Sequence, residues 1–402
     1  MDFKKAYDSI DREVLLNILN EFGVDLKLLA LIKATLTETK SKVKFLGCLS
    51  DSFQVKTGVR QGDGLSPMLF NCVLEKIIRT WQKKLLEAHY SPLKMGTKSK
   101  GVVVDCLAFA DDIAILSNDI ETARMQIDLL KEIAEQTGLQ ISFEKTEVMT
   151  NIKDAPAKLQ TKYGQINRVE KFKYLGEIIM QNGLDKEALK ERVRKLEIAY
   201  QTSRSIYNKK CLSQNTKLRH YETVLKPVVM YAAETLSLNA NKGLLEELEK
   251  KERKIIRGIL GSNYKNGTHY KKSNQEVYTK IEKVTETIRK RRARYYGHLK
   301  RMDGDRLTKQ IFHFFDSKPK TTMPWFLNTK EDLQMLHIKP EDAFNKNLFR
   351  KKILTNGLTR DEKPKRRLGT TWTEERKLAH SQRMKDFWAQ KKMKQIAKCK
   401  KT

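Results

Sequence analysis

Two adjacent carboxylates, Asp111 and Asp112, are the residues of this sequence whose surroundings most favour chemistry. Apolar, β-prone runs flank the pair and predict a hairpin over residues 101–117 with the two aspartates at its tip. Adjacent carboxylates repel each other and lose solvation between buried strands, and a divalent cation such as Mg²⁺ relieves both costs. The alternative is that the pair simply faces water.

A third carboxylate, Asp2, lies in a segment rich in polar residues over positions 2–9. If Asp2 ends a strand beside the hairpin, its side chain meets that of Asp111. Three carboxylates can then hold two metal ions about 3.5–4 Å apart, as in-line phosphoryl transfer requires. Spacing along the chain leaves this open, because Asp2 can equally be a solvated residue near the amino terminus.

A glycine-rich segment, residues 58–67, precedes a predicted helix. Its glycines, Gly58, Gly62 and Gly64, permit the close approach of a backbone or a base ring. Pro67 is predicted to open the helix, with Ser66 as its capping residue. A flexible connector is the alternative, since a glycine-rich loop alone is a weak signal.

The elements that must position these residues alternate between strand and helix over residues 1–183. Helical spacing of apolar residues covers 12–22, 25–39, 67–81 and 120–137, and strand-like runs cover 42–46, 53–55, 139–149 and 168–179. This alternation predicts an α+β layer fold. Helical stripes then predict a basic helical domain over residues 184–310, followed by a basic, partly disordered extension over residues 311–402.

The formal net charge of +31 is concentrated in the second part of the chain. Residues 1–150 carry 20 basic and 21 acidic side chains, whereas residues 151–402 carry 60 and 28. This asymmetry favours nucleic acid as a partner over a solubility surface or a membrane-facing patch. The basic run Lys363–Arg367 predicts a nuclear localisation signal, so we expect the protein in the nucleus and cytoplasm.

Several other classes of protein are disfavoured. No run of 18 or more uninterrupted apolar residues appears, so we expect no membrane span, and no basic-then-apolar segment suggests secretion. The five cysteines are scattered without a CxxC pair, which predicts neither a zinc site nor a disulfide partner.

Five segments, in order, resemble the palm motifs of reverse transcriptases, specifically those of insect-type non-LTR retrotransposons. Residues 2–9 (DFKKAYDS) resemble the first motif, residues 58–67 (GVRQGDGLSP) the template-side loop, and residues 109–112 (FADD) the metal-binding box. Residues 138–146 (GLQISFEKT) resemble the fourth motif, and residues 172–176 (FKYLG) the primer-gripping hairpin. The resemblance implies an antiparallel palm sheet with packed helices, an all-α basic thumb-like domain and a basic tail.

The resemblance also implies a ligand set for two Mg²⁺ ions, with Mn²⁺ as a substitute. Asp2, Asp111 and Asp112 would hold these ions for nucleotide transfer to a primer 3′-hydroxyl. Lys145 would lie near the pyrophosphate as a proton donor, although an exposed charge on a turn is its alternative. The implied partners are template RNA, primer DNA and deoxynucleoside triphosphates.

Further roles follow from the same resemblance. The ring of Tyr7 would exclude a ribose 2′-hydroxyl, unless it is a plain core aromatic. The residues expected to contact the incoming nucleotide or template are Phe3, Tyr7, Gln61 and Gly62. The residues expected to position the primer end are Tyr174, Leu175 and Gly176.

A predicted helix over residues 289–296 combines five basic side chains with two tyrosines, which favours contact with phosphates and unpaired bases. A solvated helix face is the alternative. The nucleic-acid-binding residues predicted here are Arg289, Arg291, Arg292, Arg294, Tyr295 and Tyr296.

Members of this family carry a fingers region before the first motif, whereas this sequence begins one residue before Asp2. We therefore expect a truncated copy whose polymerase activity is weak or absent on its own. The competing expectation is a catalytically inactive, nucleic-acid-binding remnant. An intron-encoded reverse transcriptase is a weaker alternative, which the helical region after Gly183 disfavours.

Overall fold

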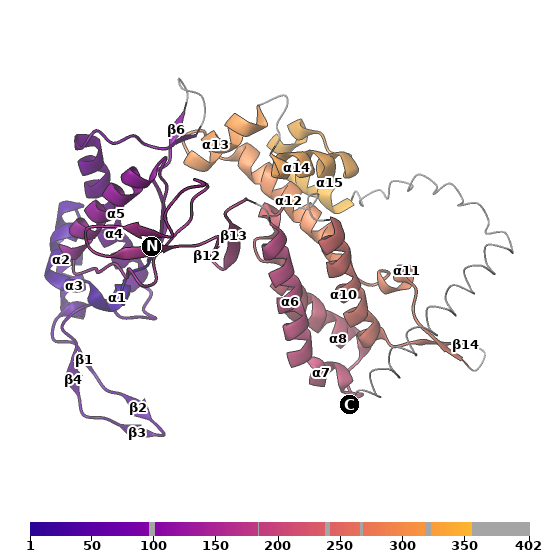
Figure 1. Ribbon diagram of the computed structural model, residues 1–402. Helices are drawn as coiled ribbons and strands as arrows, with labels where there is room; N and C mark the ends of the chain where they lie inside the picture. Colours follow the sequence, from indigo (N-terminus) through magenta and orange to yellow (C-terminus); the bar gives the residue numbers. More distant parts are fainter. Residues whose placement is uncertain (96–100, 184, 238–241, 266–267, 318–322, 356–402) are drawn as a thin grey trace, which may run out of the picture.

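The computed structural model describes residues 1–95, 101–183, 185–237, 242–265, 268–317 and 323–355. We call residues 1–183 the amino-terminal lobe and residues 185–355 the helical lobe. Figure 1 shows the two lobes side by side, with the hairpin of β12 (Lys171–Tyr174) and β13 (Glu177–Met180) between them. This hairpin packs on α6 (Lys186–Thr202), the first helix of the helical lobe.

Helices form the core of the amino-terminal lobe. The long helix α4 (Ser66–Glu87) packs against α2 (Arg12–Glu21) and α5 (Ile120–Glu135), and α3 (Leu26–Leu36) packs on α2. The fully buried Trp81 of α4 donates a hydrogen bond to the carbonyl of Gln126 in α5 at 2.9 Å. A short helix, α1 (Ala6–Ser9), follows the first strand-like residues.

The strands of this lobe are short and mostly antiparallel. β7 (Cys106–Phe109) and β8 (Asp112–Ile115) form a hairpin. β10 (Lys158–Gln160) pairs antiparallel with β11 (Gln165–Arg168), which pairs in parallel with β9 (Glu147–Val148). β5 (Lys94–Met95) and β6 (Val102–Val103) pair antiparallel. The mixture of helices and small sheets agrees with the predicted α+β class.

Three local predictions were wrong by small amounts. The turn of the β7–β8 hairpin is Ala110-Asp111, so Asp112 lies in a strand opposite Phe109 rather than at the tip. Ser66 is the first residue of α4, and no side chain caps that helix, while Pro67 lies in its first turn as predicted. The strand predicted over residues 168–179 is instead the end of β11 at Arg168, followed by the β12–β13 hairpin with its turn at Leu175-Gly176.

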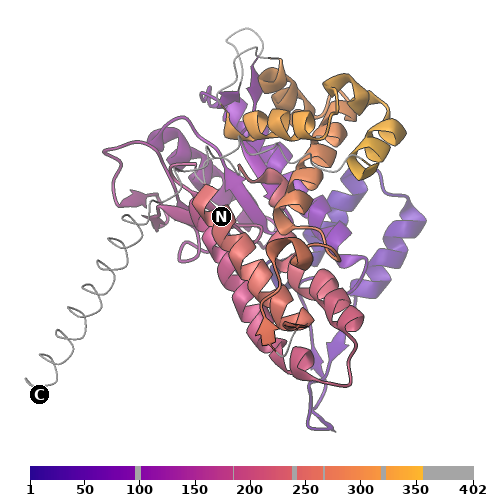
Figure 2. The same cartoon turned by 90° about the vertical axis from the view of Figure 1, so that its right-hand side faces the viewer.

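A thin ribbon extends away from the amino-terminal lobe in both views (Figures 1 and 2). Its outer hairpin is β2 (Lys44–Phe45) with β3 (Cys48–Leu49), and its base pairs β1 (Lys40–Ser41) with β4 (Phe53–Gln54). The turn at Leu46-Gly47 has positive φ at both residues, as a tight antiparallel connection requires. The ribbon exposes the side chains of Phe45, Leu46 and Leu49 and those of Lys40, Lys42 and Lys44.

The helical lobe has a first core around α6, α8 (Gln214–His220), α9 (Lys226–Met230) and α10 (Lys242–Leu260). The carboxylate of Glu252 in α10 is fully buried and accepts hydrogen bonds from the Tyr221 and Tyr278 hydroxyls and the Val284 amide. Burial raises the pKa of Glu252, and these donors oppose the rise. The smaller elements that contribute to this core are α7 (Arg204–Asn208), η1 (Tyr221–Leu225), η2 (Ala233–Thr235) and α11 (Asn274–Val277). A hairpin of β14 (Asn263–Lys265) and β15 (Thr268–Tyr270) lies outside it.

A second core forms around α12 (Val284–Arg301), which α13 (Leu307–Asp316), α14 (Pro324–Met335), η4 (Pro340–Phe344) and α15 (Lys346–Thr355) surround (Figure 2). The predicted boundary at residue 310 therefore falls inside α13. Residues 323–355 are helical and share a core with residues 293–312, so they are not an extension. The rest of the predicted tail, residues 356–402, lies outside the described residues.

An ion pair buried in this second core joins Arg292 of α12 to Asp332 of α14. The Arg292 Nε and Nη2 atoms lie 2.7 Å from the Asp332 carboxylate, and its Nη1 donates to the Leu236 carbonyl. Burial raises the pKa of Asp332 to about 6, against the opposing effect of Arg292. The structure thus places Arg292 inside the protein, and the prediction that it contacts nucleic acid does not fit this burial.

Among the helices of the described ranges, none is both long and apolar enough to cross a membrane. Cys48, Cys72, Cys106 and Cys211 are free thiols.

We predict that Asp332→Ala lowers the free energy of unfolding by about 3–5 kcal/mol, because it leaves the buried guanidinium of Arg292 without its carboxylate. Urea unfolding followed by circular dichroism measures this change. Asp305→Ala, at an exposed position, is the matched control and should change stability by less than about 0.5 kcal/mol.

A double variant separates the loss of the pair from the loss of packing. Replacing both partners with apolar residues, Arg292→Met with Asp332→Leu, should cost less than Asp332→Ala alone. Equal stability of the wild type and Asp332→Ala would contradict this account of the second core.

Candidate active site

Backbone hydrogen bonds place the first three residues between two other segments of the amino-terminal lobe. The Met1 nitrogen donates to the Ile113 carbonyl at 2.6 Å, and the Ile113 amide donates to the Met1 carbonyl at 3.3 Å. This exchange is typical of an antiparallel pair, and it puts Asp2 opposite Asp112 of β8. On the other side, Phe3 forms an antiparallel bridge with Ile141.

Asp2 and Asp112 therefore lie opposite each other on neighbouring strands, where side chains share one face. The Asp2 side chain is about one-third exposed and Asp112 is exposed, so both carboxylates are open to solvent. Both also act on the Met1 ammonium: burial lowers its pKa, and the charges of Asp112 and Asp2 oppose that shift. Asp111 precedes Asp112 in the hairpin turn and is partly buried.

The oxygen atoms of these carboxylates are the type of ligand that a hard divalent cation such as Mg²⁺ prefers. Over the ranges that the structure describes, no three His, Cys, Asp or Glu side chains form a ready metal cage. Mg²⁺ does not need one, since it is commonly held by one or two carboxylates together with water and substrate phosphates. Asp2 and Asp112 supply such oxygen atoms on an accessible face, with Asp111 adjacent.

Lys145 is the basic group beside this pair. Its Nζ atom lies 3.7 Å from the Asp2 Oδ2 atom, and its side chain is 69% exposed. The segment that carries it is anchored to the first strand, because the Ser142 amide donates to the Asp2 carbonyl at 2.9 Å and the Asp2 amide donates to the Thr146 hydroxyl. The exposed ammonium group of Lys145 is thus carried by a backbone that is hydrogen-bonded to Asp2.

The two aromatic residues of the first motif differ in accessibility. Phe3 is 4% exposed and belongs to the hydrophobic core, so its predicted contact with a nucleotide does not fit its position. Tyr7 is partly exposed, and its ring stacks on Phe70 of α4 with the centroids 4.7 Å apart. The backbone of Tyr7 is fixed as well, because its carbonyl accepts a hydrogen bond from the Val59 amide.

The glycine-rich segment packs against α1 at Gly58 and is exposed to solvent at Gln61 and Gly62. A Cβ atom on Gly58 would lie 2.5 Å from the Cα of Asp8, so only glycine permits this approach. Gln61 is exposed, and its side-chain amide donates to the Asp8 carboxylate at 3.3 Å. Gly62 is exposed with φ of +86°, and its surroundings leave room for a ligand.

The predicted primer-gripping turn lies close to the carboxylates. Tyr174 pairs with Glu177 across the β12–β13 hairpin, and the turn between them is Leu175-Gly176. Burial raises the pKa of Tyr174, and the negative charge of Asp112 raises it further. The Tyr174 hydroxyl and the carboxylate that faces Asp2 are therefore electrostatically coupled.

Residues of the helical lobe hold this turn, although nothing in their local sequence marked them. The Tyr231 hydroxyl donates to the Leu175 carbonyl, and its ring approaches Gly176. The buried guanidinium of Arg192 donates to the Glu177 carboxylate at 2.7 Å and to the carbonyls of Val229 and Tyr231. The position of the turn is therefore coupled to the helical lobe.

The basic stretch of α12 is divided between the core and the surface. Tyr296 is 3% exposed and packs in the second core, so it joins Arg292 as a residue that does not fit the predicted nucleic-acid contact. Arg291 and Arg294 are exposed. Arg289 and Tyr295 are partly buried; the ring of Tyr295 lies edge-on to Trp325.

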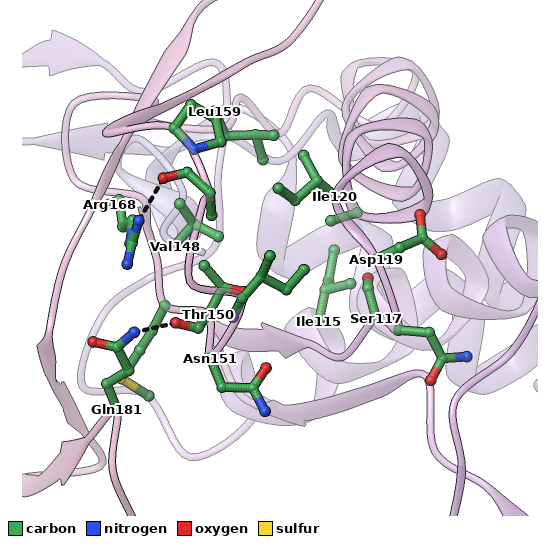
Figure 3. Close-up of a pocket in the computed structure, with 16 residues that line it drawn as sticks. Ile115, Ser117, Asp119, Ile120, Val148, Thr150, Asn151, Leu159, Arg168 and Gln181 are labelled. Carbon is green, nitrogen blue, oxygen red and sulfur yellow. Dashed lines mark hydrogen bonds between the residues drawn. The ribbon is translucent and has the colours of Figure 1, made fainter.

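A cavity of about 300 Å³ opens elsewhere in the amino-terminal lobe (Figure 3). It lies between the end of β8 and the chain around residues 148–159, and no predicted site residue lines it. Two of its polar side chains already have partners, because Arg168 donates to the Ala155 carbonyl and Gln181 to the Thr150 carbonyl. We assign no ligand to it.

Comparison with known proteins agrees with the motifs. The sequence profile of the family described as reverse transcriptase (RNA-dependent DNA polymerase) matches residues 1–179. The chain is 24% identical over 288 residues, 67% of its length, to a retrovirus-related Pol polyprotein from a type-1 retrotransposable element R2 of Popillia japonica. It is 25% identical over 195 residues to the corresponding R2 polyprotein of Nasonia vitripennis, 46% of this chain.

The match covers only part of each relative. It spans 43% of the Popillia japonica polyprotein and 18% of that from Nasonia vitripennis. A type-2 element polyprotein of Drosophila melanogaster, R2DM, is 24% identical over 188 residues, which is 44% of this chain and 17% of that relative.

We predict that Tyr231→Phe loosens the β12–β13 turn, because it removes the hydroxyl that donates to the Leu175 carbonyl. One such hydrogen bond contributes about 0.5–1.5 kcal/mol, so amide hydrogen exchange over residues 171–180 should speed up by roughly 2- to 10-fold. Mass spectrometry of exchanged peptides measures this. Tyr264→Phe, at an exposed tyrosine of β14, is the control, and unchanged exchange in Tyr231→Phe would argue against the coupling.

Proposed function

We propose that this protein is an RNA-directed DNA polymerase of the reverse transcriptase family, in its non-LTR retrotransposon branch, because the family profile matches residues 1–179 and R2 polyproteins are similar to the chain. In this proposal the amino-terminal lobe is the palm and the helical lobe the thumb. The substrates are deoxynucleoside triphosphates, and the partners are a template RNA and a primer DNA. The observation that carries the proposal is the register that puts Asp2 opposite Asp112.

The proposed reaction is transfer of a nucleotide to the primer 3′-hydroxyl at the face shared by these carboxylates. Asp2, Asp111 and Asp112 would hold Mg²⁺ or Mn²⁺. Two such ions, when bound, activate the attacking hydroxyl and neutralise the charge on the triphosphate and the leaving pyrophosphate. The solvent-open position of Asp2 and Asp112 supports this role, because both the ions and the substrate need access.

Other side chains would orient the substrates around that face. Lys145, whose ammonium group lies 3.7 Å from the Asp2 carboxylate, can donate a proton to the leaving pyrophosphate. The ring of Tyr7, fixed against Phe70, would meet the 2′-position of the incoming sugar. Gln61 and Gly62 lie on the open end of the glycine-rich segment, where they can contact the nucleotide or template.

The primer end would rest on the turn formed by Tyr174, Leu175 and Gly176. Because Tyr231 and Arg192 hold this turn, the helical lobe would set where the primer terminus lies relative to Asp112. The exposed Arg291 and Arg294 of α12 can contribute to binding of the nucleic-acid backbone, with Arg289 and Tyr295 at the edge of the same face.

The competing function is nucleic-acid binding without synthesis. Both functions share the net charge of +31 and predict salt-sensitive binding, so binding alone does not separate them. The basic run Lys363–Arg367, proposed as a nuclear localisation signal, lies outside the described residues.

We predict that the protein extends an oligo(dT) primer on poly(rA), if only weakly, when Mg²⁺ is present, and that chelation of the metal stops synthesis. Asp111→Asn should reduce extension by about 100-fold or more, because it removes a charge that would bind the metal ions. Primer-extension gels measure both effects. Asp105→Asn, also in the segment that forms the β7–β8 hairpin, serves as the control for a general loss of negative charge.

Two results would decide against synthesis as the function. Retained extension in Asp111→Asn would contradict the assigned metal ligands. Salt-sensitive binding of the primer–template by the wild type, without any extension, would favour the binding-only alternative.

We also predict that Tyr7→Ala relaxes discrimination against ribonucleotides by roughly 10- to 100-fold, because the ring that meets the 2′-hydroxyl is lost. The ratio of kcat/KM for dTTP to that for UTP measures this. Tyr7→Phe keeps the ring and should keep the ratio. A similar ratio in Tyr7→Ala and the wild type would show that Tyr7 is only a packing residue.

A further inference from the structure

A cavity of about 470 Å³ opens between the start of α2, the end of α3 and the chain that leads into the glycine-rich segment. Its wall carries two guanidinium groups, Arg12 and Arg60, together with Gln61 and the carboxylate of Asp8. Asp2, Asp111 and Asp112 do not line it, so this cavity is separate from the proposed metal site.

Arg12 lines this cavity, and its hydrogen-bond acceptors there are uncharged, so they do not neutralise its positive charge. Its guanidinium ties α2 to the end of α3 and to the incoming chain by hydrogen bonds to uncharged acceptors. These acceptors are the carbonyls of Leu36, Val55, Thr57 and Gly58 and the hydroxyl of Thr39, at 2.6–3.2 Å. The positive charge of Arg12 thus has no carboxylate partner within the described ranges.

Arg60 adds a second positive charge. Its side chain is exposed and makes no hydrogen bond or ion pair in the part of the protein that the structure describes. The two cations act on each other: burial lowers the pKa of Arg12, and the charge of Arg60 lowers it further. Asp8 is the acidic residue of the lining, and it already accepts a hydrogen bond from Gln61. Two guanidinium groups against one carboxylate leave the cavity cationic.

We propose that this cavity binds a backbone phosphate of the template strand, with Arg60 as its principal contact and Arg12 as the second charge. The proposal rests on the proposed function, because it assumes that a template passes Gln61. A planar guanidinium pairs with a phosphate through two parallel hydrogen bonds, which makes arginine well suited to this ligand. The Asp8 carboxylate would repel the phosphate, and its bond to Gln61 fixes its position at the cavity wall.

The phosphate could also come from the incoming triphosphate, but the position of the cavity favours a strand. A triphosphate bound for transfer must reach the carboxylates that hold the metal ions. The cavity is instead lined by residues of α1–α3 and of the chain from Val55 to Gln61. Of the residues expected to contact the nucleotide or template, Gln61 alone is part of this lining. We therefore assign a phosphate held there to a strand that continues past the nucleotide site.

The test is the salt dependence of binding, measured by fluorescence anisotropy with the full chain. The probe is a labelled RNA template annealed to a DNA primer that ends in a dideoxynucleotide. Arg60→Gln should weaken binding by about 10-fold. It should also reduce, by about 1, the magnitude of the slope of the logarithm of the association constant against the logarithm of the salt concentration. Arg60→Lys should restore most of the slope. Lys33→Gln, an exposed position on α3 outside the cavity, is the matched control.

A second arm identifies the source of the phosphate. Binding of dTTP to the same complex should be unchanged in Arg60→Gln. Weaker binding of dTTP with an unchanged salt slope for the RNA would overturn the template assignment, and unchanged affinity and slope in Arg60→Gln would overturn the site itself. These are binding measurements, so a failure of synthesis would contradict the proposed function and leave this inference standing.

Discussion

The structure depends on a short stretch of backbone, Met1 to Phe3, that is hydrogen-bonded on both sides. One side pairs with Ile113 of the hairpin and the other with Ile141, so Asp2 cannot move without disturbing both neighbours. Because side chains alternate along a strand, Phe3 enters the core and Asp2 faces Asp112. A buried aromatic thus fixes the position of the carboxylate next to it.

Arginine does more in this protein than provide positive charge. Arg12, Arg192 and Arg292 all donate to backbone carbonyls, and each ties together segments that are distant in the sequence. Arg192, together with Tyr231, joins the helical lobe to the turn beside Asp112. Part of the large basic excess is therefore structural, and the nucleic-acid surface must be built from the cations that remain exposed.

The sequence was sufficient to predict the α+β class, the β7–β8 hairpin and the set of motifs. It placed the turn one residue late, because the choice between Ala110-Asp111 and Asp111-Asp112 depends on backbone geometry. It could not separate Arg292 and Tyr296 from their exposed neighbours, since a basic run has the same local pattern whether or not one side chain meets Asp332 from another helix. Arg12 was missed for the same reason: its five acceptors are all distant in the sequence.

In the proposed function, carboxylates from two neighbouring strands share metal ions. Electron paramagnetic resonance of Mn²⁺, titrated into the protein with a chain-terminated primer–template and a deoxynucleoside triphosphate, counts the ions bound. We expect two Mn²⁺ ions per chain with the resonance of a coupled pair, and loss of that coupling in Asp2→Asn. Binding of a single uncoupled ion, or the same coupled signal in Asp2→Asn, would contradict this expectation.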